Sequence, residues 1–295
     1  MEKFSTWRDK ATGISPFMPH QFPISQNRQN KLITTLQIIL IKTPIFILKF
    51  PSFILLTLLY YITGSTSLLN LIFKFIFGFN DVNYSVDGIK RSQLDKLQSY
   101  KPKIGDLIVT NYSSPLDGFI FNLISGTSSI IILIPDKKGD LYQYTPWSLI
   151  SHCFGKNSNN RPIEETSKFK HKIVFLLLEG TTSNNQSILP FIKLNPKYTF
   201  DGISSIKSMV LKFSPNYFTI PIPINISKFY YLFELLTDFK SKTFKIKIYK
   251  FDNFNLVDIR KSFELNSLAL INNKDLSIDG KEDFIKYYLN HDIKK

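Results

Sequence analysis

The strongest constraint on the fold of this chain is an apolar run near its amino terminus. Residues 32–62 contain only two charged side chains, Lys42 and Lys49. A membrane-spanning helix needs about 20 apolar residues, so the run is long enough to cross a bilayer. Pro44 and Pro51 each remove a backbone hydrogen-bond donor, which argues against a single straight helix.

Three interpretations of this run are open. It could span the bilayer from about residue 44 to 62, or it could be a buried core helix. The interpretation that we prefer is a kinked re-entrant or monotopic hairpin whose lysines reach one headgroup layer. A second apolar patch, residues 68–79, is too short to span, and Lys74 within it indicates an interfacial segment. We therefore expect a polar segment at 1–31 that is not a secretory signal, a membrane anchor at 32–79 and a folded domain at 80–295.

Composition narrows the class of protein. In 295 residues, 43% are hydrophobic and 27 are Phe, which excludes a disordered chain. The net charge of +14 indicates an anionic partner such as a membrane surface, a phosphorylated substrate or nucleic acid, or else a solvated basic surface. We find no nucleic-acid-binding module. Cys153 is the single cysteine, so an internal disulfide is excluded and a reducing compartment is indicated. We interpret it as a packed side chain rather than a nucleophile.

Short apolar runs alternate with helical patterns beyond residue 80. The patterns predict a fold of the α/β class, with a central mixed, largely parallel sheet flanked by helices. The alternation of Lys with apolar residues at 244–249 favours an edge strand. Predicted strands cover residues 107–110, 130–134, 173–178, 218–226 and 244–249, and predicted helices lie within 87–99, 117–124 and 283–289.

Two polar blocks directly follow predicted strands. They are NYSSPLD at 111–117 and EGTTSNNQS at 179–187. Because ligands of open α/β sheets bind at the carboxyl ends of strands, we expect both blocks in one pocket. Gly180 allows a tight turn whose backbone N–H groups can face an anion. Two simpler interpretations are that Asp117 caps a helix and that 179–181 is an ordinary turn.

The blocks resemble the two motifs of the phospholipid/glycerol acyltransferase superfamily, Asn-His-x-x-x-x-Asp and Pro-Glu-Gly-Thr-Arg-Ser. MEKFSTWRDKATGISPF at the start and LLEGTTSNNQSILPF look close to its fungal branch of lysophosphatidic acid:oleoyl-CoA acyltransferases, found at the endoplasmic reticulum and lipid droplets. The resemblance implies a membrane-bound, cytosol-facing enzyme. It would move a fatty acyl group, oleoyl in this branch, from acyl-CoA to the free hydroxyl of lysophosphatidic acid, in phospholipid and triacylglycerol synthesis. Neither metal nor bound cofactor is implied.

The resemblance also assigns roles to residues. It makes Asp117 and Tyr112 catalytic, and the substrate-binding residues are Asn111, Glu179, Gly180, Thr181, Thr182 and Ser183. Tyr112 stands where the family has its catalytic His, and Thr182 stands where it usually has Arg. An ordinary Tyr has a pKa of about 10, so a free phenolate base costs roughly 4 kcal/mol near neutrality.

These two departures leave alternatives open. Tyr112 could bond to Asp117, His152 or His171 could reach the site although each is expected at the surface, or catalysis could be lost. In the last case the chain would be a lipid-binding or membrane-trafficking adaptor. The missing Arg could be offset by a cation from elsewhere, for which the candidates are Lys193, Lys197 and Arg161.

Overall fold

Seven strands form the central sheet of the computed structural model, which describes residues 2–22, 35–156, 161–200, 202–223 and 226–292. Their order across the sheet is β1-β8-β7-β2-β5-β3-β4. They are β1 (Phe79–Val86), β2 (Asp106–Thr110), β3 (Ile130–Pro135), β4 (Leu141–Tyr144), β5 (Ile173–Leu176), β7 (Ser205–Ser214) and β8 (Lys242–Phe251). Only β3–β4 and β7–β8 pair antiparallel, which confirms the predicted mixed, largely parallel sheet.

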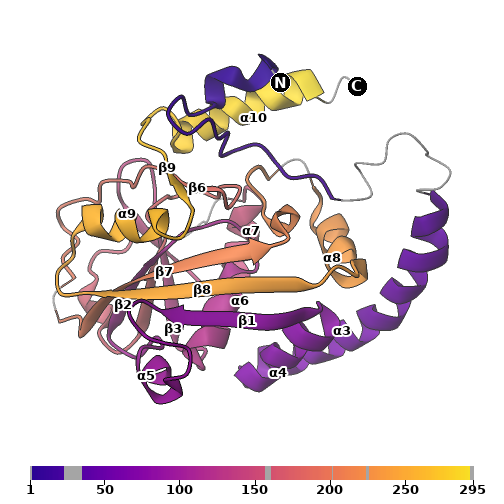
Figure 1. Ribbon diagram of the computed structural model, residues 1–295, viewed down its shortest axis with the longest axis horizontal. Helices are drawn as coiled ribbons and strands as arrows, with labels where there is room; N and C mark the ends of the chain where they lie inside the picture. The colour runs from indigo at the N-terminus through magenta and orange to yellow at the C-terminus, as the bar shows by residue number, and fades with distance from the viewer. Residues whose placement is uncertain (1, 23–34, 157–160, 201, 224–225, 293–295) are drawn as a thin grey trace.

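Both faces of the sheet are buried. Successive side chains of a strand point to opposite faces, so Ile108 and Phe175 face one core whereas Val109 and Leu176 face the other. The first core is covered by α3 (Thr43–Thr63), α4 (Thr66–Leu71), α6 (Asp117–Ser125), α7 (Pro146–Cys153) and α8 (Lys228–Thr237). The second core is covered by α9 (Leu256–Glu264) (Figure 1). The short α5 (Leu94–Ser99) packs through Leu97.

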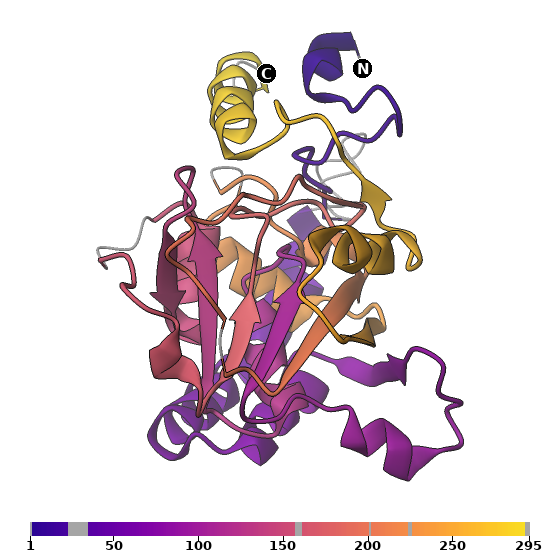
Figure 2. The same ribbon diagram turned by 90° about the vertical axis from the view of Figure 1, so that its left-hand side faces the viewer.

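The two ends of the chain lie together beyond one edge of the sheet. Figure 2 shows the N-terminal segment and α10 (Ile278–Asp292) above the strands. Phe4, Trp7 and Phe17 pack against Phe284 of α10. Below them, β6 (Ser187–Ile188) and β9 (Ala269–Leu270) form a small parallel sheet.

Two strand predictions were wrong. Residues 219–223 form no strand, and residues 224–225 lie outside the described residues; Pro221 and Pro223 have no N–H group to pair. Strand β8 is not an edge strand but lies between β1 and β7. Its exposed Lys245 therefore marks a partly exposed face of an inner strand. Our patterns missed β1, β4 and β7, whose sequences mix polar and apolar residues.

The apolar run folds as one helix over Thr35–Thr63. The π-helical turn η2 (Ile38–Lys42) lies directly before Pro44, and the helix curves rather than breaks (Figure 1). The chain reverses at Gly64, which has a φ of 62°. The segment that follows, α4 and η3 (Ile72–Ile76), folds back along α3, where the Phe53 and Phe77 rings lie 5.6 Å apart.

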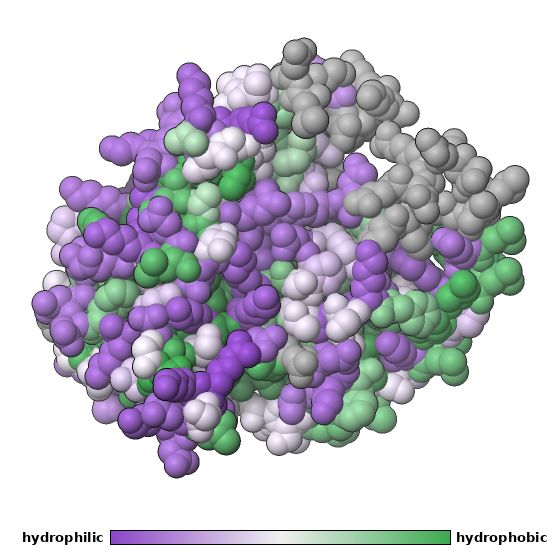
Figure 3. Space-filling view, in the orientation of Figure 1, coloured by the Kyte–Doolittle hydropathy of each residue, from purple (hydrophilic) through white to green (hydrophobic). Residues whose placement is uncertain are grey.

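This second segment is mainly a core element. Leu69, Ile72, Phe73 and Ile76 are buried, whereas Phe75 is exposed. Core packing thus accounts for most of the apolar residues that we had interpreted as interfacial. Helix α3 differs, because only its inner face packs against the fold. Its outer face exposes large apolar side chains, among them Ile47, Leu48, Ile54, Leu55, Leu58, Leu59 and Ile62. Hydrophobic residues gather along this flank in Figure 3.

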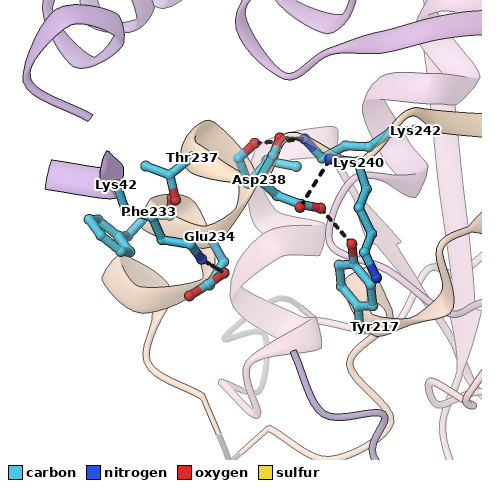
Figure 4. Close-up of polar contacts among 9 residues, drawn as sticks. Lys42, Tyr217, Phe233, Glu234, Thr237, Asp238, Lys240 and Lys242 are labelled. Carbon is cyan, nitrogen blue, oxygen red and sulfur yellow. Dashed lines mark hydrogen bonds and ion pairs between the residues drawn. The ribbon is translucent and has the colours of Figure 1, made fainter. Parts of the chain in front are cut away.

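A buried ion pair fixes the start of this helix to α8. Lys42 Nζ lies 2.5 Å from Glu234 Oε2, and both side chains are at least nine-tenths buried (Figure 4). Nearby, Lys242 Nζ donates to the Phe77 and Asp238 carbonyl oxygens at 2.7 and 2.8 Å. Lys49 Nζ donates to the Ile76 oxygen at 3.0 Å. Lys42 therefore holds the start of this helix to α8, and Lys49 holds it to the segment that folds back along it.

Candidate active site

The two polar blocks meet at one edge of the sheet. Strands β2 and β5 are parallel neighbours, so the residues after them emerge side by side. The Tyr112 N–H donates to Glu179 Oε1 at 2.9 Å, and the Ser183 N–H donates to the Tyr112 oxygen at 3.0 Å. The structure therefore brings together the two blocks as the sequence predicted.

The first block is held by its own polar side chains. Asn111 exchanges two hydrogen bonds of 2.9 Å with the backbone of Leu211 on β7. Oδ2 of Asp117 accepts from the N–H groups of Ser113 and Ser114 at 2.8 and 3.0 Å. Its Oδ1 is buried and has no hydrogen-bond partner among the described residues. Burial raises the pKa of Asp117 to about 7, although the two N–H groups act to lower it.

Glu179 links the second block to the first and to its own turn. Its Oε2 accepts from the Leu189 N–H at 2.8 Å, while Oε1 accepts from Tyr112. Burial raises the pKa of Glu179 to about 8. The carboxyl group thus joins backbone segments of the site, which is a positioning role.

Gly180 is required by the turn that follows. Its φ is 66°, and a Cβ there would lie 2.4 Å from Ile192 Cδ1 and 2.8 Å from Ile278 Cδ1. A larger residue would therefore displace the turn and the chain that continues into Thr181.

A lysine from α10 is buried under this turn. Lys281 Nζ donates to Thr181 Oγ1 at 2.8 Å and to Thr182 Oγ1 at 2.7 Å, and also to the Thr182 carbonyl oxygen. Thr182 in turn donates to the Ile220 oxygen at 2.6 Å, and the Ser183 hydroxyl donates to the Ser187 oxygen. Burial lowers the pKa of Lys281 to about 7.

Tyr112 is fully buried and does not bond to Asp117. Its hydroxyl lies 3.0 Å from Nδ1 of His152 on α7 and 3.5 Å from the Leu149 oxygen. The Tyr112 and His152 rings lie within 22° of parallel. Our expectation of a surface His152 was therefore wrong, because the side chain is largely buried against this tyrosine.

Two cavities adjoin α7. An apolar cavity of about 200 Å³ is lined by Pro115 and Leu116 of the first block and by Trp147, Ile150 and Phe154. A polar cavity of about 380 Å³ is lined by His152 and Gly180. Its other lining side chains include Asp136, Lys137, Lys138, Tyr142, Tyr144 and Glu282.

A third cavity, of about 510 Å³, continues from the polar one and shares Lys137 and Ile278 with it. Its cations are Lys137, Lys193, Arg260 and Lys274. Together the two polar cavities have five cationic and three acidic side chains, a balance that favours anions. The described residues contain no group of His, Cys, Asp and Glu that could hold a metal ion.

The sequence did not identify the cation that reaches the second block. We had named Lys193, Lys197 and Arg161. Lys193 lines the third cavity, and Lys197 pairs with Asp140 at 2.6 Å. The cation in contact with Thr182 is Lys281, about 100 residues along the chain, and no spacing in the sequence could have indicated it.

The fold and site define a class: an α/β protein whose strand-end motifs lie between an apolar and a polar cavity, with an exposed apolar helix alongside. The chain is similar to lysophosphatidic acid:oleoyl-CoA acyltransferase 1 of Saccharomyces cerevisiae, with 29% identity across the whole chain and 99% of that protein. A Schizosaccharomyces pombe protein is 26% identical over 77% of this chain and 78% of its own length, and its name assigns it the same activity provisionally. No protein-family model matches the chain, and no solved structure matches it significantly. The resemblance indicated by the motifs is thereby confirmed.

Proposed function

We propose that this protein transfers an oleoyl group from oleoyl-CoA to the free hydroxyl of lysophosphatidic acid and so forms phosphatidic acid. The observation that carries the proposal is the meeting of the Tyr112 and Glu179 blocks between an apolar and a polar cavity. A reaction between a long acyl chain and a phosphate-bearing acceptor needs both environments. The similarity to two fungal proteins named for this activity supports the same reaction.

The apolar cavity suits the acyl chain. Its exposed lining is almost entirely apolar, and it lies between α3, α4, α6, α7 and α8. Burial of each methylene group contributes about 0.8 kcal/mol, so an apolar cavity of this kind favours the methylene groups of an acyl chain over a polar group. Helix α7 also contributes His152 to the polar cavity, so a bound thioester could lie near both.

The polar cavities suit phosphate groups. In the proposal, the acceptor's phosphate occupies the cavity beside Gly180, where Lys138 lies and where the buried charge of Lys281 is close. The phosphates of CoA occupy the adjoining cavity with Lys193, Arg260 and Lys274. Substrate binding by Asn111, Thr181, Thr182 and Ser183 is then indirect, because these residues fix the turns that shape the cavities.

The exposed apolar face of α3 supports membrane attachment. Contacts hold the other face of the helix to the domain at both ends. Lys42 pairs with Glu234, and the Tyr60 hydroxyl accepts a hydrogen bond from Asn122 Nδ2 at 2.8 Å. A helix that crossed the bilayer upright would draw the attached domain into hydrocarbon. We therefore propose a monotopic arrangement, with α3 in the interface of one leaflet. The helix over Thr35–Thr63 would form the anchor of a cytosol-facing enzyme on the endoplasmic reticulum and lipid droplets, acting in phospholipid and triacylglycerol synthesis.

The reaction requires neither metal nor bound cofactor in this proposal. The acceptor hydroxyl attacks the thioester carbonyl, the new ester bond forms, and CoA leaves as its thiol. The site must remove the hydroxyl proton and return one to the leaving sulfur.

The experiment uses the purified full-length chain in micelles with radiolabelled oleoyl-CoA and three acceptors: lysophosphatidic acid, lysophosphatidylcholine and monoacylglycerol. We expect phosphatidic acid as the main product. The alternative, an inactive lipid-binding adaptor, is favoured by one observation, the buried tyrosine in place of the family histidine. Binding of lysophosphatidic acid without any product would support that alternative.

A further inference from the structure

Tyr112, which stands where the resemblance places the catalytic base, cannot act as a base in this chain. Tyr112 is fully buried, and burial raises its pKa well above its ordinary value. Its phenol therefore stays protonated at neutral pH. An active enzyme must take the acceptor's proton with another group.

His152 has the geometry of that group. Its Nδ1 lies 3.0 Å from the Tyr112 oxygen, and the Tyr144 ring packs edge-on against it at 4.9 Å. The side chain lines the polar cavity together with Gly180. Among the described residues none bonds to its second ring nitrogen, Nε2, so this nitrogen is free to meet a substrate.

We propose that His152 is the general base of the acyl transfer and that Tyr112 orients its ring; this inference rests on the proposed function. In this proposal, the Tyr112 hydroxyl donates to the Leu149 oxygen at 3.5 Å, and the Tyr112 oxygen accepts from His152 Nδ1–H at 3.0 Å. This arrangement fixes the tautomer in which Nε2 carries the lone pair. A base oriented by a third group is the general pattern of activated catalytic sites.

In the transfer, His152 takes one proton from the acceptor and returns it to the leaving sulfur. His152 Nε2 takes the proton of the acceptor hydroxyl while its oxygen forms a bond to the thioester carbonyl carbon. The C–S bond breaks, and the CoA sulfur takes the proton from the imidazolium. The products are phosphatidic acid and CoA thiol, and His152 is neutral again.

Burial, together with the charge of Lys281, keeps His152 neutral at physiological pH. Burial, assisted by the positive charge of Lys281, lowers the pKa of His152 to about 4. A phosphate anion in the cavity would oppose this and raise the pKa toward neutrality. We therefore expect kcat, which reports the substrate-bound enzyme, to fall with decreasing pH as the ring takes up a proton. The groups that face it are Tyr112, Tyr144, Cys153 and Lys281, with Asp136, Lys137, Lys138 and Glu282 around the same cavity.

The test compares four variants of the full-length protein with the same oleoyl-CoA assay. His152→Gln should lower kcat by about 100-fold or more with little change in KM, since a general base contributes roughly 10²–10⁴-fold. Tyr112→Phe should lower kcat less, by about 10-fold. His171→Gln, at an exposed histidine, is the matched control and should leave activity unchanged. His152→Ala should regain at least 10-fold activity with added imidazole, more at pH 8 than at pH 6.

The outcomes separate this inference from the proposed function. An inactive wild-type protein would overturn both. An active wild type with equally active His152→Gln would overturn the role of His152 alone. If both His152 variants keep the wild-type melting temperature but imidazole restores nothing to His152→Ala, the histidine acts by positioning, and the proposal is also overturned.

Discussion

Lys281 Nζ lies 2.7 Å from the hydroxyl oxygen of Thr182, although 99 positions separate the two residues in the chain. The helix that carries Lys281 also packs on the N-terminal segment through Phe284. The cation that supports the second motif therefore depends on both ends of the chain. In the acyltransferase motif that the second block resembles, an Arg within the motif itself usually stands at the position of Thr182.

We predict that Lys281→Met lowers kcat/KM for lysophosphatidic acid by about 10–100-fold, equivalent to roughly 1.4–2.7 kcal/mol. The substitution removes the charge near the polar cavity and leaves the Thr181 and Thr182 acceptors without their donor. Monoacylglycerol, which has no phosphate, should be less affected. The control is Lys286→Met on the same helix, whose exposed side chain pairs with the exposed Asp283. Equal losses of kcat/KM with lysophosphatidic acid and with monoacylglycerol would show that the role of Lys281 is structural.

Asp117→Asn should change how stability depends on pH. The folded-state pKa of about 7 lies above the ordinary value of 3.8, so Asp117 binds its proton more tightly in the folded state. The stability it contributes is full below about pH 4 and is lost as pH rises through 7. Relative to wild type, Asn should therefore gain about 3 kcal/mol of unfolding free energy between pH 5 and pH 8. Urea unfolding in detergent at both pH values measures this; a constant difference would contradict it.

The apolar cavity should set acyl-chain preference. Thr57 lines it, and its hydroxyl is buried with no partner among the described residues. We predict that Thr57→Phe fills part of the cavity and lowers the ratio of kcat/KM for oleoyl-CoA to that for decanoyl-CoA by about 10-fold, since a few methylene contacts are worth 1–3 kcal/mol. Thr57→Val, which keeps the volume, should preserve the ratio. An unchanged ratio in Thr57→Phe would place the acyl chain elsewhere.

The Lys42–Glu234 pair should hold α3 to the domain. Lys42→Met leaves a buried, unpaired carboxylate and should destabilise the protein by about 3–5 kcal/mol. The double variant Lys42→Met/Glu234→Leu should recover most of that loss, because two apolar side chains of similar size replace the pair. Denaturant unfolding of Lys42→Met, Glu234→Leu and the double variant gives the coupling free energy between the two side chains. Additive losses would show that the pair contributes nothing beyond packing.

The sequence predicted the sheet best where strands are wholly apolar. Residues 107–110, 130–134 and 173–178 were recognisable because both faces of these strands are buried. The sequence did not indicate strand β7 because this strand includes Lys207 and Lys212. Lys207 is buried because it pairs with Asp106 and donates to the Tyr100 and Lys101 carbonyl oxygens. Such a pair joins distant residues and leaves no local pattern.

The candidate site was predicted in outline. The two blocks follow strands that a parallel sheet places together, so their meeting could be anticipated. The roles of their side chains could not, because Asn111, Asp117 and Glu179 bond to backbone groups of the site loops and of β7. His152 was named only as one of two histidines, since its contact with Tyr112 depends on how α7 packs.

The most direct test of the account is product formation by the purified full-length protein beside one matched pair of glycine variants. Gly180 and Gly126 have almost the same φ, 66° and 65°, but a Cβ at Gly126 meets nothing within 4 Å whereas one at Gly180 strikes Ile192. With labelled oleoyl-CoA and lysophosphatidic acid, the account predicts that wild type and Gly126→Ala form phosphatidic acid in equal amounts, each with an equal amount of free CoA thiol. Gly180→Ala should form at least about 100-fold less of both products, on the scale of a lost catalytic contact. A wild-type protein that binds lysophosphatidic acid but forms no phosphatidic acid, or a Gly180→Ala variant as active as Gly126→Ala, would contradict it.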